Sequence, residues 1–243
     1  MTSPSTTKTK PRVIALIAAA GQGTRLGAEV PKAYVELRGR TLLERSVRAL
    51  LASGVVDEVI VLVSPDMEPE AARIIGRIDT TNAAPIRLVH GGSERADSVW
   101  AGLQAIPDDD AVVLIHDAAR ALTPPAMVRD VAKRVLEGAP AAVPVVPVAD
   151  TIKEVAADAV VSTPDRSRLR AVQTPQAFRL PALRQANLDY WAEQPEFTAT
   201  DDASLMEWHG EHVATVPGDT LAFKITTPID LTLAHALTEE THD

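Results

Sequence analysis

Apolar and amphipathic stretches alternate along the chain up to residue 148. Continuous apolar runs, which are typical of buried strands, occur at residues 12–20, 58–63, 86–90, 111–115 and 141–148. Helical spacing of apolar positions predicts helices over residues 42–52, 65–78 and 124–137, and another that starts at residue 93. Thr41 and Glu44 indicate a capping box at the start of the first of these helices. This alternation predicts an α/β fold, with a Rossmann-like, mostly parallel sheet and helices on both faces.

The pattern changes after residue 148. Two short β-like runs, residues 150–155 and 159–162, flank a turn at Ala157–Asp158 and predict a hairpin with no helix attached. Because an isolated two-stranded ribbon is marginally stable in water, this protruding arm, at about residues 148–170, is expected to rest on a second subunit of a homodimer. Beyond the arm, residues 181–191, 200–209 and 228–237 are expected to be helical. Residues 211–216 and 221–226 are expected to form strands.

Composition limits the classes of function. The chain has 243 residues, of which 46% are hydrophobic, enough for one domain over residues 12–243 after a disordered tail at residues 1–11. The formal net charge of −9 disfavours a nucleic-acid or anionic-membrane binder. The absence of cysteine excludes disulfides and thiolate chemistry. There is no apolar run of roughly 18 residues to span a membrane and no apolar secretory core in the tail, so we expect a cytoplasmic enzyme.

A glycine-rich loop follows the first predicted strand. Gly21, Gly23 and Gly27 leave room for a ligand to approach the backbone, and Arg25 and Lys32 add positive charge. A dinucleotide-binding loop would need a discriminating residue about 20 residues on, but the next strand begins far beyond that distance. The G-K-[ST] of an NTPase P-loop is absent. A nucleotidyltransferase loop and a plain strand–helix turn with solvated cations both remain possible from this stretch alone.

Other motifs are expected at the same edge of the sheet. Ligands of such sheets collect beyond the carboxyl ends of the strands. The glycine loop, the pair Gly91–Gly92 and the carboxylate of Asp117 all follow predicted strands. This edge is therefore the predicted ligand site.

Several stretches together resemble the 2-C-methyl-D-erythritol 4-phosphate cytidylyltransferase family. They are AAAGQGTRLGAEVPKAY (18–34), GGSERADSV (91–99), IHDAAR (115–120), DTIK (150–153), DRSRL (165–169), TPQAF (174–178), TDDAS (200–204) and KITTPID (224–230). The first stretch is shared with other sugar-phosphate nucleotidyltransferases, whereas the combination is specific. The resemblance implies transfer of CMP from CTP to 2-C-methyl-D-erythritol 4-phosphate, with Mg²⁺ as the cofactor. Related alternatives are a transferase acting on ribitol 5-phosphate or another alcohol phosphate, and a non-catalytic nucleotide-binding protein.

The resemblance also implies residue roles. Arg25 and Lys32 match positions that stabilise the transition state on the triphosphate, while Arg166 and Lys224 match positions that orient the acceptor phosphate. In the family the arm crosses the dimer, so Arg166 and Thr151 would serve the partner's site. Asp117 would lie beside Mg²⁺ and the CTP phosphates.

Further matching positions would bind the substrates. They are Ala19, Ala20, Gly21, Gly92, Ser93 and Ser98 around the nucleotide, and Arg120, Thr174 and Thr200 elsewhere in the substrate site. Arg95 could bind a ligand or brace its loop, and both readings stay open. His116 is interpreted as a structural strand-end residue. We also expect the loop at residues 22–30 to be mobile without ligand.

Overall fold

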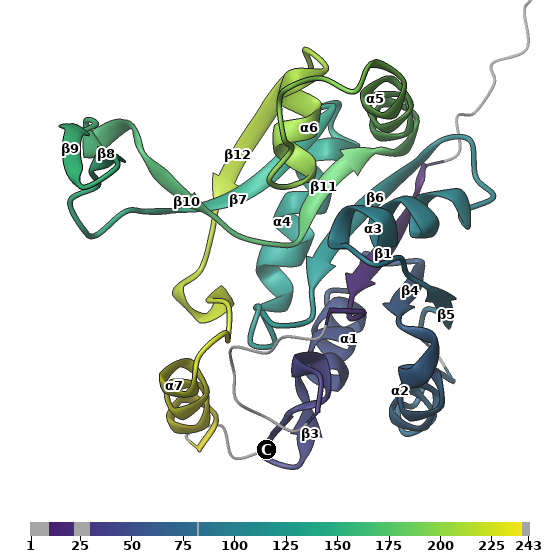
Figure 1. Ribbon diagram of the computed structural model, residues 1–243. Coiled ribbons are helices and arrows are strands. Elements are labelled where there is room, and N and C mark those ends of the chain that lie inside the picture. Colours follow the sequence, from purple (N-terminus) through teal and green to yellow (C-terminus); the bar gives the residue numbers. More distant parts are fainter. Residues whose placement is uncertain (1–9, 22–29, 82, 240–243) are drawn as a thin grey trace, which may run out of the picture.

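The computed structural model describes residues 10–21, 30–81 and 83–239 (Figure 1). Most of the predicted tail, and Arg25 with nearly all of the loop expected to be mobile, lie outside these ranges. Within them, no helix combines the length and the apolar character needed to cross a bilayer.

A central eight-stranded sheet organises the described residues. Its strands are β1 (Arg12–Ala18), β4 (Glu58–Val63), β5 (Ile86–His90), β6 (Ala111–Asp117), β7 (Ala141–Pro147), β10 (Arg170–Val172), β11 (Gln176–Arg179) and β12 (Val213–Pro217). They follow the order β10-β7-β11-β6-β1-β4-β5, and β12 also pairs with β7. Parallel pairing joins β1 to both β4 and β6, and β4 to β5. The predicted mostly parallel α/β fold is confirmed.

Helices cover both faces of this sheet (Figure 1). They are α1 (Leu42–Ala52), α2 (Glu68–Ile75), α3 (Arg95–Gln104), α4 (Pro125–Leu136), α5 (Leu180–Glu193), α6 (Asp202–Trp208) and α7 (Pro228–Glu239). Short 3-10 helices are η2 (Lys32–Tyr34), η3 (Pro65–Met67), η4 (Arg166–Arg168) and η5 (Thr220–Ala222). A small ribbon pairs β2 (Glu36–Leu37) with β3 (Arg40–Thr41).

The core forms two layers because successive side chains of a strand point to opposite faces. Along β1, Ala15 and Ile17 pack in the cluster that includes α1, α2 and α4. Ile14 and Leu16 pack in the other cluster, with α3, α5 and α6. The continuous apolar run therefore reflects burial on both sides of the strand.

Two segments differ from the sequence prediction. Residues 221–226 were expected to be a strand, which is wrong: the chain makes the 3-10 turn η5, where Asp219 Oδ1 accepts from the backbone N–H of Leu221 at 2.8 Å. Ile225 is instead buried in a small third cluster, against which Phe223 packs. The TPQAF stretch forms β11, an unpredicted strand that pairs antiparallel with β6 and β7.

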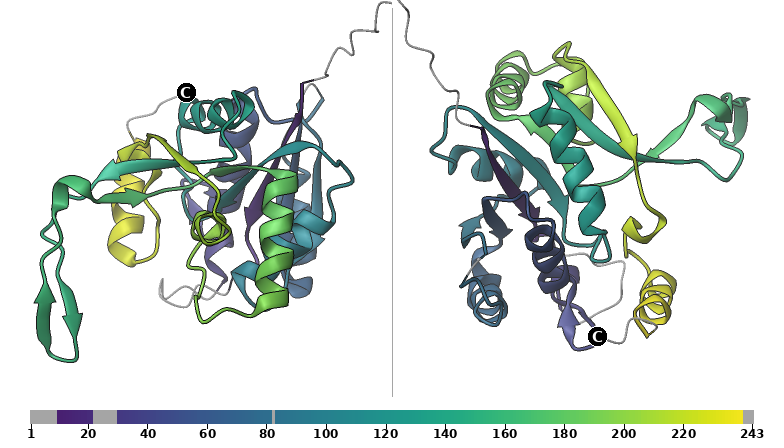
Figure 2. Two further views of the ribbon diagram at one scale, coloured as in Figure 1. Left: turned by 90° about the horizontal axis from the view of Figure 1, so that it is seen from above. Right: turned by 180° about the vertical axis from the view of Figure 1, so that it is seen from behind.

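The predicted hairpin is confirmed. Strands β8 (Glu154–Ala156) and β9 (Ala159–Ser162) pair antiparallel in a separate sheet, with Ala157 in the left-handed region at φ 52°. The hairpin lies at the end of an arm that leaves the body of the molecule (Figure 2). Val155, Val160 and Val161 are each at least 60% exposed there. The described residues of this chain therefore leave these three valines largely uncovered.

Candidate active site

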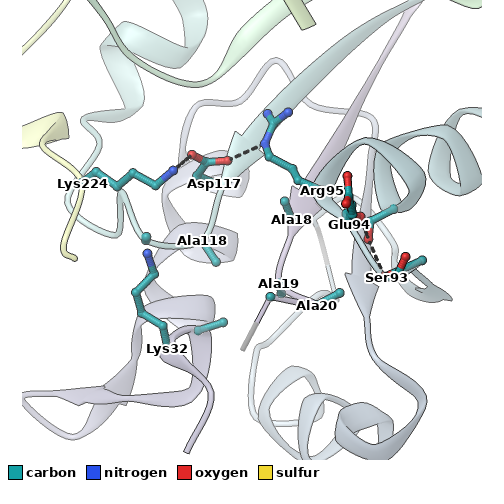
Figure 3. Close-up of a pocket in the computed structure, with 15 residues that line it drawn as sticks. Ala18, Ala19, Ala20, Lys32, Ser93, Glu94, Arg95, Asp117, Ala118 and Lys224 are labelled. Carbon is teal, nitrogen blue, oxygen red and sulfur yellow. Dashed lines mark hydrogen bonds and ion pairs between the residues drawn. The ribbon is translucent and has the colours of Figure 1, made fainter. Parts of the chain in front are cut away.

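A cavity of about 310 Å³ lies beyond the carboxyl ends of β1, β5 and β6 (Figure 3). The predicted site residues that line it are Ala19, Ala20, Gly21, Lys32, Gly92, Ser93, Ser98, Asp117 and Lys224. Ala18, Ala33, Glu94, Arg95, Ala118 and Ala119 also line it. The expected edge of the sheet is therefore the place where these motifs meet.

Small residues keep the nucleotide side of the cavity open. A Cβ at Gly91 would lie 2.5 Å from Ser98 Oγ, and one at Gly92 would lie 2.2 Å from Asp97 Cβ. The second glycine turn can thus approach the first turn of α3 only without side chains. That turn is fixed by a capping box in which the backbone N–H of Glu94 donates to Asp97 Oδ2 at 3.2 Å.

Asp117 lies between two cations. It ends β6 with 8% of its surface exposed. Lys224 Nζ is 2.7 Å from Oδ2, and Arg95 Nε is 3.2 Å from Oδ1 (Figure 3). Burial alone would raise the pKa of Asp117, but Arg95 and Lys224 outweigh burial and hold the pKa far below its ordinary value. The carboxylate is therefore ionised whenever the protein is folded near neutral pH.

Arg95 bridges Asp117 and a second carboxylate. Its Nη1 lies 2.8 Å from Asp202 Oδ2, which makes an ion pair. Burial lowers the pKa of Arg95, and the charges of Asp202 and Asp117 raise it further than burial lowers it. Of the two readings left open by the sequence, these contacts favour the brace.

A buried pair supports the backbone of Asp117 from behind. The backbone N–H of Asp117 donates to Thr174 Oγ1 at 3.1 Å, and the same oxygen lies 3.1 Å from His116 Nδ1. Burial lowers the pKa of His116 to about 4, so the imidazole is neutral. His116 is thus a structural residue, as expected. Thr174, predicted to bind substrate, does not line the cavity and holds Asp117.

Arg120 positions the segment that carries Lys224. Its Nη1 donates to the carbonyl oxygen of Ala222 at 2.7 Å, and its Nη2 donates to that of Val172 at 3.3 Å. The backbone N–H of Ile225 donates to Ala119 O at 2.9 Å. These bonds fix the chain on both sides of Lys224.

Besides Arg120 and Thr174, three more predicted residues lie outside the cavity lining. Thr200 precedes α6, where its backbone N–H donates to Ser204 Oγ at 3.0 Å. Thr151 is exposed on the arm. Arg166 donates to the carbonyl oxygen of Ala149 at 2.6 Å, in a separate hollow at the base of the arm. Arg25 lies outside the described residues.

The sequence analysis missed the role of Asp202. It placed both aspartates of the TDDAS stretch within a predicted helix and gave neither a separate role, but Asp201 alone caps α6 by accepting from the backbone N–H of Ser204 at 2.8 Å. One carboxylate suffices for an N-cap. Because the N-cap needs only Asp201, the presence of Asp202 beside it in the TDDAS stretch could have indicated a second role for this residue.

No group of three His, Asp or Glu side chains that could hold a metal ion occurs within residues 10–21, 30–81 and 83–239. Asp117 is the predicted metal ligand in the cavity, and both of its carboxylate oxygens are already paired with cations. A divalent ion fits here only if phosphate oxygens of a substrate supply most of its ligands, as is usual for Mg²⁺.

Comparison with known proteins identifies close relatives. Over 232 residues the chain is 62% identical to the 2-C-methyl-D-erythritol 4-phosphate cytidylyltransferase of Corynebacterium efficiens, covering 94% of each chain. It is 63% identical over 230 residues to the protein of that name from Corynebacterium diphtheriae, again covering 94% of each.

Solved structures of proteins with the same described activity superpose on this chain. The 4-diphosphocytidyl-2C-methyl-D-erythritol synthase of Anaerococcus prevotii superposes with a TM-score of 0.81 at 30% identity, covering 96% of this chain and all of that one. The 2-C-methyl-D-erythritol 4-phosphate cytidylyltransferase of Thermus thermophilus gives a TM-score of 0.73 at 35% identity, with 94% and 99% covered. Residues 13–240 match the family as a whole. The chain belongs to the 2-C-methyl-D-erythritol 4-phosphate cytidylyltransferase family.

Proposed function

We propose that this chain transfers CMP from CTP to 2-C-methyl-D-erythritol 4-phosphate. A phosphate oxygen of the acceptor attacks the α-phosphorus of CTP, and the bond from that phosphorus to the bridging oxygen of the β-phosphate breaks. The products are 4-diphosphocytidyl-2-C-methyl-D-erythritol and pyrophosphate. The observation that carries this proposal is the cavity in which Lys32, Lys224 and Asp117 meet two glycine turns. Two anions must approach one another in this reaction, so the enzyme works mainly by neutralising and aligning them.

The nucleotide half of the site is the small-residue side of the cavity. Ala19, Ala20 and Gly21 on one turn, and Gly92, Ser93 and Ser98 on the other, leave space and backbone groups for cytosine and ribose. Lys32 lines the same cavity from η2. We assign Lys32 and Arg25 to the triphosphate, where their charges offset the negative charge that builds up on the α-phosphoryl and leaving oxygens.

The acceptor half centres on Lys224. Its ammonium group is a compact charge suited to a phosphate, and Arg120 holds its backbone in place. Thr174 supports the neighbouring Asp117. We assign Thr200, at the start of α6, to the same half.

A homodimer completes this half. Arg166 and Thr151 belong to the arm, outside the cavity of their own protomer. The exposed valines of the arm and its separate two-stranded sheet favour a second copy as its support. We therefore propose that Arg166 and Thr151 act in the partner's site.

Mg²⁺ is the proposed cofactor. Asp117 and the phosphate oxygens of CTP would hold it, and when bound it would neutralise charge on the triphosphate. The chain's own cations, Lys32 and Lys224, align the two substrates beside it. We place the reaction in the cytoplasm, where CTP is available.

Pyrophosphate release tests the function. Purified protein with CTP, Mg²⁺ and 2-C-methyl-D-erythritol 4-phosphate should release pyrophosphate, and ribitol 5-phosphate should support far less. The reverse preference would assign the alternative acceptor, whereas no release with either would indicate a binding protein.

Lys32→Ala tests the assignment of the nucleotide half. Losing a charge that acts on the transition state should lower kcat by about 100-fold or more. Lys133→Ala is the matched control, because Lys133 lies on the exposed surface of α4 beside Glu137. Equal turnover of the two variants would contradict the assignment.

A further inference from the structure

A second buried carboxylate lies behind the cavity. Asp202 is 6% exposed and does not line the cavity itself. The capping of α6 belongs to its neighbour Asp201. Burial raises the pKa of Asp202, and the charge of Arg95, 2.8 Å away, opposes this rise without cancelling it. The position of this carboxylate therefore needs a reason other than helix capping.

Asp202 is the first member of a series of alternating charges. Arg95 contacts Asp202 through Nη1 and Asp117 through Nε, and Asp117 contacts Lys224. The four side chains come from α6, α3, the end of β6 and the segment after η5. Figure 3 shows Arg95 and Lys224 approaching Asp117 from opposite sides. A displacement of Arg95 thus changes what holds Asp117 and Lys224.

We infer that Asp202 is a positioning residue for the acceptor half of the site. It holds one nitrogen of the Arg95 guanidinium, so that another faces Asp117, and thereby fixes the ammonium of Lys224 where the acceptor phosphate arrives. The planar fork of Arg offers the two carboxylates separate nitrogens, Nη1 and Nε, at a fixed spacing, whereas Lys has a single nitrogen. Without Asp202 the flexible stem of Arg95 is free to turn away from Asp117. This inference rests on the proposed function of Lys224.

A merely structural ion pair would behave differently. Removing one partner of a buried pair destabilises the fold by leaving the other charge uncompensated. Such a loss lowers the melting temperature and changes the kinetic constants for both substrates to a similar extent. A positioning role acts mainly on the acceptor, because Lys224 is the end of the series.

Steady-state kinetics of Asp202→Asn separate these roles. We expect kcat/KM for methylerythritol phosphate to fall about tenfold or more, since small displacements of aligned groups cost this much. The KM for CTP should change by less than about twofold. The control is Glu58→Gln, another buried carboxylate held by two arginines, Arg12 and Arg87, but at the opposite end of the sheet. Equal acceptor kinetics in wild type and Asp202→Asn would overturn the inference.

A double-mutant cycle tests the route through Arg95. If Asp202 acts through Arg95, adding Asp202→Asn to Arg95→Gln should cost much less than adding it to the wild type. Additive losses would contradict this route. Should Asp202→Asn fail to fold, Arg95→Lys takes its place, because it keeps the charge and loses the double contact; it should show the same bias toward the acceptor, and unchanged acceptor kinetics would count against the inference.

A crystal structure of Asp202→Asn gives a readout that needs no activity. Arg95 should leave Asp117, and an unchanged Arg95–Asp117 contact overturns the inference even if the wild type releases no pyrophosphate. Failure of the wild type to release pyrophosphate would instead defeat the proposed function. The two failures are thereby distinguishable.

Discussion

Glu58 shows at the residue scale how a buried charge is compensated away from the active site. Burial would raise the pKa of Glu58, but hydrogen bonds from Arg87 and Arg12 lower it below its ordinary value of 4.5. A carboxylate with a depressed pKa stabilises the fold above its unfolded pKa, and this contribution is lost as pH falls through the folded value. We expect Glu58→Gln to lower the free energy of unfolding by about 2 kcal/mol at pH 7.

The same substitution carries a pH signature. The difference between wild type and variant should shrink as pH falls below 4.5, where the unfolded carboxyl is protonated. Urea unfolding of both proteins at pH 7, 5 and 3.5 measures this difference in the free energy of unfolding. A difference that stays constant over this range would show that packing, and not ionisation, accounts for the loss.

Single residues also mark how far the sequence could predict the site. The glycines, Lys32 and Asp117 were found because local motifs and strand ends bring them to one edge of the sheet. The bracing roles of Arg120 and Asp202 were not, since their partners lie at least 50 residues away along the chain. No local spacing encodes such contacts.

At the scale of elements, caps and burial decide where helices begin. Thr41 Oγ1 accepts from the backbone N–H of Glu44 at 3.1 Å, which confirms the N-cap half of the predicted capping box. The other half is wrong, because the side chain of Glu44 pairs with Arg48. Thr41→Ala should destabilise the protein by about 1 kcal/mol and lower Tm by about 2–4 °C. Differential scanning calorimetry measures this loss.

Thr41→Ser is the matched control, because Ser keeps the oxygen that caps the helix. It should retain most of the stability. A loss as large as that of Thr41→Ala would mean that packing of the Thr methyl group, and not the cap, accounts for the effect.

Elements buried on both faces were predictable from their apolar runs, whereas a short strand without a neighbouring turn signal was not. β11 spans only Gln176–Arg179, too few residues for a periodic pattern, and its place between β6 and β7 follows from long-range pairing. Residues 221–226 look like a strand because apolar residues predominate, yet Phe223 and Ile225 pack in a cluster with Leu37, Leu42 and Ala234 outside the sheet. Apolar character predicted burial, and tertiary contacts chose the backbone conformation.

At the scale of the whole molecule, the arm separates Arg166 from the cavity of its own protomer. A dimer with exchanged arms predicts complementation. Mixing Lys32→Ala with Arg166→Ala should give hybrid dimers with one intact site, and random pairing should restore about a quarter of the wild-type activity. Pyrophosphate release after co-refolding measures the restoration.

Lys32→Ala mixed with Lys224→Ala provides the control, because both residues line the same cavity. Every hybrid then carries a defect in each site, so activity should stay at the level of the parents. Restoration in this control, or its absence in the first mixture after hybrids have been verified, would argue against a shared site.

The carboxylate of Asp117 has a consequence for competition among cellular anions. A pocket of bare cations would fill with inorganic phosphate, whereas here a small anion must displace a carboxylate held at 2.7 Å by Lys224. A triphosphate reaches several cations at once and gains enough to do so. Inorganic phosphate should therefore inhibit only far above the KM for CTP, and inhibition at similar concentrations would refute this. The built-in counterion therefore disfavours occupation of the empty cavity by a small anion that makes no other contact.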